Sequence, residues 1–372
     1  MRMKEKYIRT VSMKNNNLLI IGKTPPPIGG VTIHVQRLID TLEKNHIKFR
    51  FEHLSKKKIL PLLFLTVIKK RLIHLHSSSP YIRFVFAFLC SISKTHAIIT
   101  YHGNIGRFNN VGNWFDKVSI KFSSVPIVLN TESLKLAQKI NVGTILIPAF
   151  IPPVKEDILP SRIKHNLEQL KSKCSVIFCT NAYRLSFDKD KNEIYCGSLL
   201  VKLFSRKENQ QYGLIFSDPS GSYKRFFEQQ QINLSKNIHF ISEPHSFFEI
   251  LKFSDCFLRA TTTDGDPLSV KEALFLNKKV IASDVIKRPS GCITFNWQDI
   301  DSLQEKIHQI NGAPESISNE PIINGAEKII QLYNNFLSYE TNRPRPEKRQ
   351  YPIRRRTCPS SKDRSVVDKN NP

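Results

Sequence analysis

The sequence predicts an α/β protein with two tandem, doubly wound domains that face a central cleft. Short, almost wholly apolar segments alternate with helical stretches along most of the chain. This alternation is typical of parallel sheets that helices cover on both faces. Three prolines in P-A-F-I-P-P (148–153) interrupt the alternation, which then starts afresh, so we expect a domain boundary there. The 372 residues are enough for two hydrophobic cores.

The first series of strands and helices predicts an N-terminal domain over residues 15–155. Its clearest helix follows the first strand, because apolar side chains recur at intervals of three and four from Val31 to Leu42 and form one stripe. The expected strands of this domain are 18–22, 49–54, 72–77, 97–102, 126–130 and 144–148.

The second series predicts a C-terminal domain over residues 156–340, and a last helix near 325–338 is a candidate to cross back onto the first domain. Basic segments flank the two domains. They are an N-terminal extension (1–14) and a tail rich in Pro and Arg (341–372), which we expect to be disordered because it has no apolar period. The expected strands are 175–180, 213–217, 238–242, 256–261, 279–283 and 292–295, and the other expected helices are 192–207, 245–253, 267–277 and 299–310.

The net charge of +24 predicts an anionic partner: a nucleic acid, an anionic membrane surface or a phosphorylated substrate. Residues 43–73 hold nine Lys and Arg against two acidic residues, around an apolar run at 59–68. A nucleic acid is disfavoured, because the chain has no recognisable binding module and part of its basic charge lies in the two flanking segments.

Cysteine usage and the N-terminus predict a cytoplasmic protein. The seven cysteines are scattered singly, which favours reduced thiols and excludes the close cysteine pairs of a structural zinc site. Residues 1–17 contain no apolar core of a signal peptide. The longest apolar runs, 59–68 and 84–92, fall well short of the roughly 20 residues that span a bilayer. We therefore expect no membrane-spanning segment.

Two glycines mark a candidate anion site in P-P-P-I-G-G-V-T (25–32). Gly29 and Gly30 lie between the first strand and the first helix, where backbone N–H groups can approach an anion and the helix N-terminus favours negative charge. A tight turn without a ligand is the alternative interpretation. The chain has neither the G-x-G-x-x-G dinucleotide motif here nor a Walker A motif, so a nicotinamide enzyme and a P-loop ATPase are disfavoured.

Two cations follow the first strand of the second domain, in T-N-A-Y-R-L-S-F-D-K (180–189). We expect Arg184 and Lys189 to lie where a ligand in the cleft would sit. Two cations suit a diphosphate leaving group, because negative charge grows on it as its bond breaks. A solvated loop in which Asp188 is the neighbouring acid is an equally good interpretation of this segment alone.

The segment T-T-T-D-G-D-P-L-S-V-K-E-A-L (261–274) allows two interpretations. Asp264 and Asp266, two positions apart, resemble a metal-binding pair. Asp264 and Glu272 instead combine a loop carboxylate with one on the wall of a helix that begins near Pro267. In the second interpretation the backbone amides around 265–268 point into the cleft, and the two acids can hold both ends of a nucleotide sugar. The structural alternative makes the aspartates loop-forming caps and Glu272 a surface residue.

Four elements of the chain together resemble the family 4 retaining glycosyltransferases, which have the GT-B fold. The segment D-G-D-P-L-S-V-K-E-A-L-F-L-N-K-K-V-I-A-S-D is similar to that family's E-G-F-x-x-x-x-x-E-A signature followed by P-V-I-A-S. Arg184 and Lys189 match its R-x-x-x-x-K pattern, G-G-V (29–31) its glycine loop, and T-Y-H-G (100–103) its strand-end histidine. The resemblance runs from about residue 17 to residue 310.

The resemblance implies a role for each matching residue. Glu272 would bind the nucleotide ribose, Arg184 and Lys189 would neutralise the diphosphate, and Asp264 and His102 would lie at the reacting end of the sugar as catalytic candidates. The positive clamp makes a metal ion or other cofactor unnecessary. Asp264 departs from the family by being one methylene shorter than its glutamate, and Asp266 by adding an acid to the loop. The other expected donor-binding residues are Gly29, Gly30, Gly265, Asp266, Leu268 and Ser269.

We therefore expect a retaining glycosyltransferase that moves a sugar from a nucleoside-diphosphate donor, with UDP or GDP as the nucleotide. The first domain would bind the acceptor, with Glu132 as a candidate contact that could equally cap its helix. The basic, apolar segment 43–73 predicts a docking face for an anionic membrane and a lipid-linked glycan acceptor. This places the enzyme on the inner face of the plasma membrane, in the assembly of a surface polysaccharide such as capsule or O-antigen.

Three other interpretations of the sequence are available. A non-catalytic nucleotide-sugar-binding protein would have the same fold and site. A basic nucleic-acid-binding protein explains the charge but not the motifs. A metal-dependent GT-A transferase would not explain the second series of strands and helices. His74 and His76 alternate on one strand and would face the same side as a possible metal pair, although packing at the strand end is the favoured role.

Overall fold

A computed structural model describes residues 18–55, 72–188, 190–264, 267–310 and 322–341. Several sequence predictions lie outside these residues. They are the N-terminal extension, the basic tail, the apolar run at 59–68, and the site candidates Lys189, Gly265 and Asp266.

The N-terminal domain contains a six-stranded sheet with the order β2-β1-β3-β4-β5-β6, and each neighbouring pair is parallel. All five residues of β1, of β3 and of β4 are buried, as expected for strands with helices on both faces. The strands are β1 (Leu18–Gly22), β2 (Arg50–His53), β3 (Leu72–His76), β4 (Ala97–Tyr101), β5 (Val125–Val128) and β6 (Ile145–Leu146), and the helices are α1 (Gly30–Lys44), α3 (Pro80–Ile92), α4 (Asn110–Phe122) and α5 (Thr131–Gln138).

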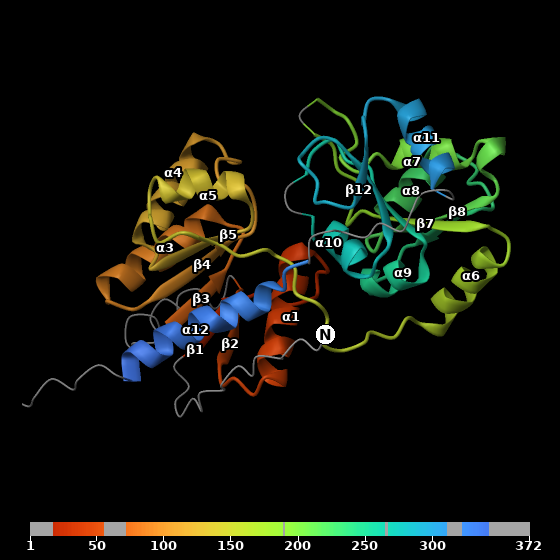
Figure 1. Ribbon diagram of the computed structural model, residues 1–372. Helices are drawn as coiled ribbons and strands as arrows, with labels where there is room; N and C mark the ends of the chain where they lie inside the picture. The colour runs from red at the N-terminus through yellow and green to blue at the C-terminus, as the bar shows by residue number, and fades with distance from the viewer. Residues whose placement is uncertain (1–17, 56–71, 189, 265–266, 311–321, 342–372) are drawn as a thin grey trace, which may run out of the picture.

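The C-terminal domain repeats this architecture with the order β12-β11-β10-β7-β8-β9, again with parallel neighbours. Its strands are β7 (Val176–Asn181), β8 (Tyr212–Ser217), β9 (Ile238–Ile241), β10 (Cys256–Arg259), β11 (Lys279–Ser283) and β12 (Cys292–Phe295), and its helices are α6 (Ser161–Lys171), α7 (Gly197–Phe204), α8 (Ser222–Gln229), α9 (Phe247–Phe253), α10 (Leu268–Phe275) and α11 (Ile300–Gln309). The predicted fold class, two doubly wound α/β domains, is therefore confirmed (Figure 1).

Helix α6 was not predicted from the sequence, which has a polar character in this region. Only Ile163, Leu167 and Leu170 of α6 are buried. Their spacing of four and three residues forms a narrow stripe that packs on the same face of the second sheet as α9 and α10. Three buried positions in an eleven-residue helix give too weak a pattern to stand out from a loop.

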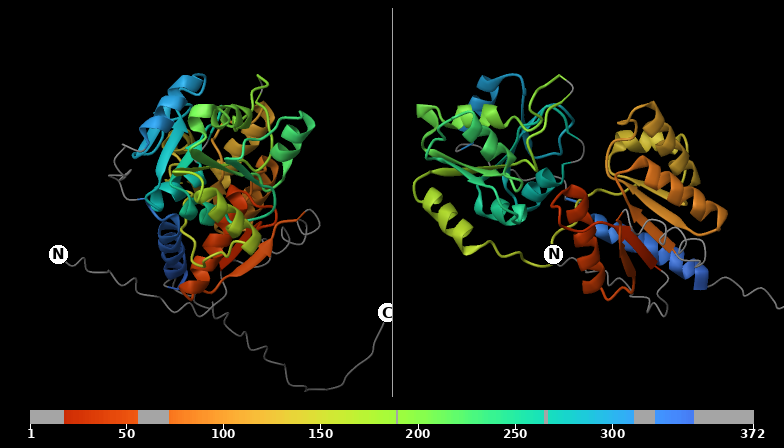
Figure 2. Two further views of the ribbon diagram at one scale, coloured as in Figure 1. Left: turned by 90° about the vertical axis from the view of Figure 1, so that its right-hand side faces the viewer. Right: turned by 180° about the vertical axis from the view of Figure 1, so that it is seen from behind.

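The last helix, α12 (Gly325–Thr341), lies on the first domain although it follows the second in sequence (Figures 1 and 2). Ala326, Ile329 and Tyr333 are buried in the same hydrophobic cluster as residues of β1. The helix begins where the chain passes the domain linker, because the Gly325 N–H donates to the Phe150 carbonyl over 2.7 Å. A Cβ at position 325 would lie 2.2 Å from the Pro148 oxygen, so this close approach requires glycine.

None of the helices in the described residues combines the length and apolar character that crossing a bilayer requires.

Candidate functional site

The two domains meet where α1 of the first passes α10 of the second (Figure 1). The Arg37 guanidinium lies 2.5 Å from the Glu272 carboxylate, and both side chains are about nine-tenths or more buried. Arg37 also stacks over the Phe248 ring of α9 and donates to the Ile151 carbonyl of the linker. Arg37 therefore joins α1, the helix that follows the glycine loop, to Glu272, the candidate ribose-binding residue of α10.

Glu272 was predicted to bind the ribose of a nucleotide. In this structure its carboxylate faces Arg37 of α1 and is 6% exposed. The interpretation that makes Glu272 a surface residue is therefore wrong. Ribose binding stays a prediction. A ribose that binds the Glu272 carboxylate would have to share it with the Arg37 guanidinium or displace that guanidinium.

Asp264 is held between two guanidinium groups that sequence reasoning missed. Arg259, the last residue of β10, donates to both carboxylate oxygens over 3.0 Å, and Arg288 donates to one of them over 2.8 Å. Burial by itself would raise the pKa of Asp264, but the charges and hydrogen bonds of Arg259 and Arg288 outweigh it and lower the pKa to about 2. Asp264 is thus a fixed anion at neutral pH and cannot act as a general acid there.

The two guanidinium groups also argue against the metal-pair interpretation of the D-G-D segment. A divalent cation needs carboxylate oxygens with free lone pairs, and those of Asp264 already accept from Arg259 and Arg288. The adjacent positive charges would further repel a cation. The second acid of that pair, Asp266, lies outside the described residues.

The glycine loop leads into α1 with space beside its glycines. An added Cβ at Gly30 would meet no atom within 4 Å, and one at Gly29 would meet only the Thr32 hydroxyl, at 4.0 Å. Gly29 has an extended backbone (φ −169°), which any residue can adopt. Neither internal packing nor backbone strain therefore requires glycine here, and α1 begins without a side-chain cap. These are the conditions under which a ligand can approach a helix N-terminus.

Arg184 follows β7 and is solvent-exposed. The nearby Asp188 accepts from the backbone N–H groups of Asp190 and Asn192, both over 2.9 Å. The Asp188 carboxylate therefore holds its own loop together.

Helix α10, like α1, begins without a side-chain cap. It follows Pro267, and its first residues are the half-buried Leu268 and the buried Ser269.

Glu132 is exposed in the first turn of α5 but does not cap that helix. Asn130 is the cap, because its side-chain oxygen accepts from the Ser133 N–H over 2.8 Å. The capping interpretation of Glu132 is therefore wrong. Its negative charge in the first turn still interacts favourably with the positive N-terminal end of the helix dipole. Its proposed contact with an acceptor stays a prediction.

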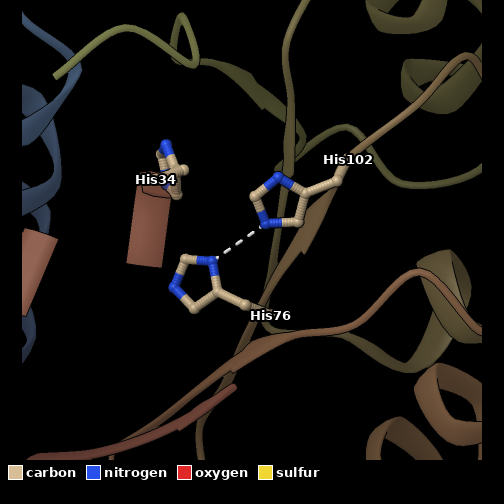
Figure 3. A group of neighbouring side chains, drawn as sticks. All are labelled: His34, His76 and His102. Carbon is tan, nitrogen blue, oxygen red and sulfur yellow. Dashed lines mark hydrogen bonds between the residues drawn. The ribbon is translucent and has the colours of Figure 1, made fainter. Parts of the chain in front are cut away.

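His102, which follows β4, belongs to a group with His34 and His76 (Figure 3). The sequence pointed to His76 and His102 but not to His34. Nε2 of His102 lies 3.0 Å from Nδ1 of His76, and the His102 ring centroid lies 5.0 Å from that of His34 on α1. Burial, followed by the charges of neighbouring histidines, holds the pKa of His76 and of His102 well below 6.5, and burial lowers that of His34 to about 4. All three imidazoles are therefore neutral at pH 7.

His74 has a packing role, as expected. Its two ring nitrogens are bonded to the Tyr333 hydroxyl and the Thr100 hydroxyl, at 2.5 and 2.8 Å. The prediction that His74 and His76 face the same side is also confirmed, since their ring centroids are 4.1 Å apart. His34 was missed because its position is set by a contact with Ala149, far along the chain.

No protein-family model matches the sequence, and no curated protein matches it significantly. Solved structures do match. HepE of Anabaena in complex with UDP aligns over 87% of this chain and 99% of its own, with a TM-score of 0.60 and 13% identity. The chain has the GT-B fold. S. aureus MnaA with UDP aligns over 88% of this chain and 98% of its own (TM-score 0.60, 14% identity), and sucrose-phosphate synthase from Thermosynechococcus elongatus over 87% and 100% (TM-score 0.57, 14% identity). At such identities the similarity concerns the GT-B fold alone.

Proposed function

We propose that this protein is a glycosyltransferase that uses a nucleoside-diphosphate sugar. The observation that carries the proposal is the meeting of α1 and α10 at the domain junction, where Arg37 contacts Glu272. Both helices begin without a side-chain cap, and helix N-termini are favourable places for phosphate groups. The solved structures of HepE and MnaA with UDP make UDP the first nucleotide to test.

In the proposed reaction an acceptor hydroxyl oxygen bonds to the anomeric carbon on the face that the diphosphate leaves. As the carbon–oxygen bond to the diphosphate breaks, the electron pair stays on the phosphate oxygen, which also takes the acceptor proton, and configuration is retained. Arg184 and Lys189 would stabilise the growing charge without a metal ion. The ionised Asp264 would hold a sugar hydroxyl, and neutral His102 would line the sugar site. Family 4 membership is part of this proposal.

UDP is expected to raise the thermal unfolding temperature, because it binds the folded state only. Arg184→Ala should lose most of that shift by removing a phosphate contact. Gly30→Ala should also lose it, since the added methyl group would occupy the space beside the α1 N-terminus. Gly30→Ala should leave the protein without UDP at least as stable as before, because Gly30 is a helical residue.

Lys164→Ala is the matched control, since it removes one exposed cation from α6, on the side of the second domain away from the first (Figure 1). It should keep the full UDP shift. EDTA should leave the shift unchanged. No shift with UDP, GDP or their sugars would overturn the proposal, whereas binding without transfer or donor hydrolysis would favour the non-catalytic alternative.

We further propose that the acceptor is a lipid-linked glycan in surface polysaccharide assembly, reached at a membrane surface. An aromatic patch on α3 and α4 supports this: Tyr81 and Phe88 are 51% and 40% exposed and Trp114 is 55% exposed. The Phe84 ring joins the two helices, 5.9 Å from Phe88 and 6.2 Å from Trp114. Exposed Lys117 and Lys121 follow Trp114 on the same face of α4. Aromatic rings beside lysines suit an anionic bilayer interface.

The protein is expected to float with liposomes that contain anionic lipid at low salt, and to be released at high salt as charge screening grows. Trp114→Glu should abolish flotation, whereas Val142→Glu, on a still more exposed apolar residue outside the patch (91% exposed), should not. Equal flotation of both variants would contradict the role of the patch.

A further inference from the structure

Three histidines from three separate elements converge at one end of the first sheet (Figure 3). His34 comes from α1, His76 from the last position of β3, and His102 from the segment after β4. One ring nitrogen from each lies within 4.8 Å of the other two. His34 and His76 are almost fully buried, with 2% and 1% exposure.

The hydrogen bonds of the protein do not satisfy this group. Nε2 of His34 and Nε2 of His76 are both buried without a partner. Nδ1 of His34 lies 2.8 Å from the Ala149 carbonyl oxygen, which can only accept, so Nδ1 carries the proton and Nε2 has a free lone pair. A backbone carbonyl that fixes the far nitrogen of an imidazole is the usual support of a metal-ligating histidine.

The spacing also suits one ion. Nδ1 of His76 and Nε2 of His102 are 3.0 Å apart. Two nitrogen ligands at about 2.0–2.1 Å on a tetrahedral zinc ion stand about 3.3 Å apart, so a small movement would convert the hydrogen bond into two metal bonds. As the ion binds, the imidazole that donates in that hydrogen bond would carry its proton on its other ring nitrogen instead, so that both ligands stay neutral. We propose that His34, His76 and His102 form a binding site for a divalent transition metal with the chemistry of zinc.

The surroundings restrict which ion this can be. The three ligands are neutral nitrogens, and the charge of Arg37 acts on His34 while the charges of Arg83 and Arg107 act on His102. Hard cations such as Mg²⁺ and Ca²⁺ need oxygen ligands and negative charge, whereas imidazole suits zinc, copper and nickel. These positive charges would oppose a bound cation, so an anion as the fourth ligand would be needed to offset them. The three histidines belong to the first domain, whereas Arg184 of the proposed diphosphate clamp belongs to the second. An occupied metal site would take the lone pair of His102 that faces His76.

The test uses the full chain without an affinity tag, treated with a chelator and then freed of it. Co²⁺ serves as the probe because it replaces zinc and absorbs strongly in the visible range only when it is four- or five-coordinate. We expect one equivalent of Co²⁺ to produce this absorption and one equivalent of Zn²⁺ to remove it, while Mg²⁺ has no effect. Zn²⁺ affinity is measured by competition with a chromophoric chelator.

His34→Gln and His76→Gln should each lower the Zn²⁺ affinity by at least about 100-fold, since loss of even a residue that only supports a ligand costs 10–100-fold. His245→Gln is the buried control, because His245 lies in the second domain and bonds Ser217 and Glu243. His165→Ala is the exposed control. Both should bind Zn²⁺ as the unaltered protein does.

If a variant fails to fold, the Co²⁺ spectrum of the unaltered protein still tests the proposal. Absence of the strong absorption, or Zn²⁺ binding of unchanged affinity in folded His34→Gln and His76→Gln, would show that the cluster is three packed imidazoles and overturn the proposal. Neither readout depends on glycosyl transfer, so failure of this proposal and failure of the proposed function are distinguishable.

Discussion

Asp264→Asn is expected to lower the free energy of unfolding by about 3 kcal/mol at pH 7 and to abolish glycosyl transfer. Arg259 and Arg288 are both largely buried, with side chains 12% and 1% exposed. The asparagine would leave them without a counter-charge. The depressed pKa of Asp264, about 2, gives a similar magnitude by linkage to folding. Denaturant unfolding of both proteins measures the difference.

The effect has a defined pH dependence. The folded-state pKa of Asp264 lies below the ordinary carboxyl value of about 3.9. The stability from its ionised form is therefore fully present above that value and is lost as the pH falls through about 2. The gap between the unaltered protein and Asp264→Asn should be constant from pH 5 to 7, narrow below about pH 4 and close below about pH 2.

Asp301→Asn is the control for this prediction. The Asp301 side chain is 82% exposed and lies 3.8 Å from Arg206 at the surface, and exposed pairs contribute little to stability. The same loss of stability in both variants, or a gap that persists at acid pH, would contradict the argument that two buried guanidinium groups hold Asp264.

The surroundings of Asp264 show what sequence patterns can and cannot predict. The strand at 256–261 and the helix at 267–277 were expected from apolar periodicity, and the structure has β10 and α10 in these places. Arg259 and Arg288 were not identified as partners, because their contact with Asp264 depends on sheet register. Arg259 pairs with Ala282 on β11, and the chain after β11 returns Arg288 to the same carboxylate.

Contacts between elements that are distant in the sequence could not be predicted from it either. Arg37 belongs to the polar part of an amphipathic helix, where an exposed cation is the ordinary expectation. His34 likewise has no local sign that Ala149, 115 residues away, will orient its ring. The position of Arg37 follows from how the two domains pack, and that of His34 from a contact between distant parts of the first domain. A local pattern of apolar residues encodes neither.

Arg37→Met and Glu272→Met are each expected to destabilise the protein by about 3–5 kcal/mol, because each leaves a buried charge without its partner. The double variant Arg37→Met/Glu272→Met should cost much less than the sum, since apolar side chains can replace a buried ion pair with little loss. Denaturant unfolding of the four proteins forms a double-mutant cycle and measures the coupling.

Lys155→Met is the matched control for this cycle. Lys155 also joins the linker to α1, through Asp40 at 3.1 Å and Glu43 at 3.6 Å, but its side chain is 67% exposed. We expect little change in stability, because solvent screens this pair. Additive effects of Arg37→Met and Glu272→Met would show that the two residues do not stabilise the domain junction as a pair.

UDP binding to Arg37→Met and to a further variant, Glu272→Gln, separates a structural pair from a ribose site. Arg37→Met keeps the Glu272 carboxylate and frees it from its guanidinium partner, so a ribose-binding Glu272 should keep or increase the UDP-induced shift in unfolding temperature. Glu272→Gln should lose that shift, because a neutral amide accepts hydrogen bonds less strongly than a carboxylate. If instead Glu272→Gln keeps the full shift, Glu272 serves the junction alone and the ribose must bind elsewhere.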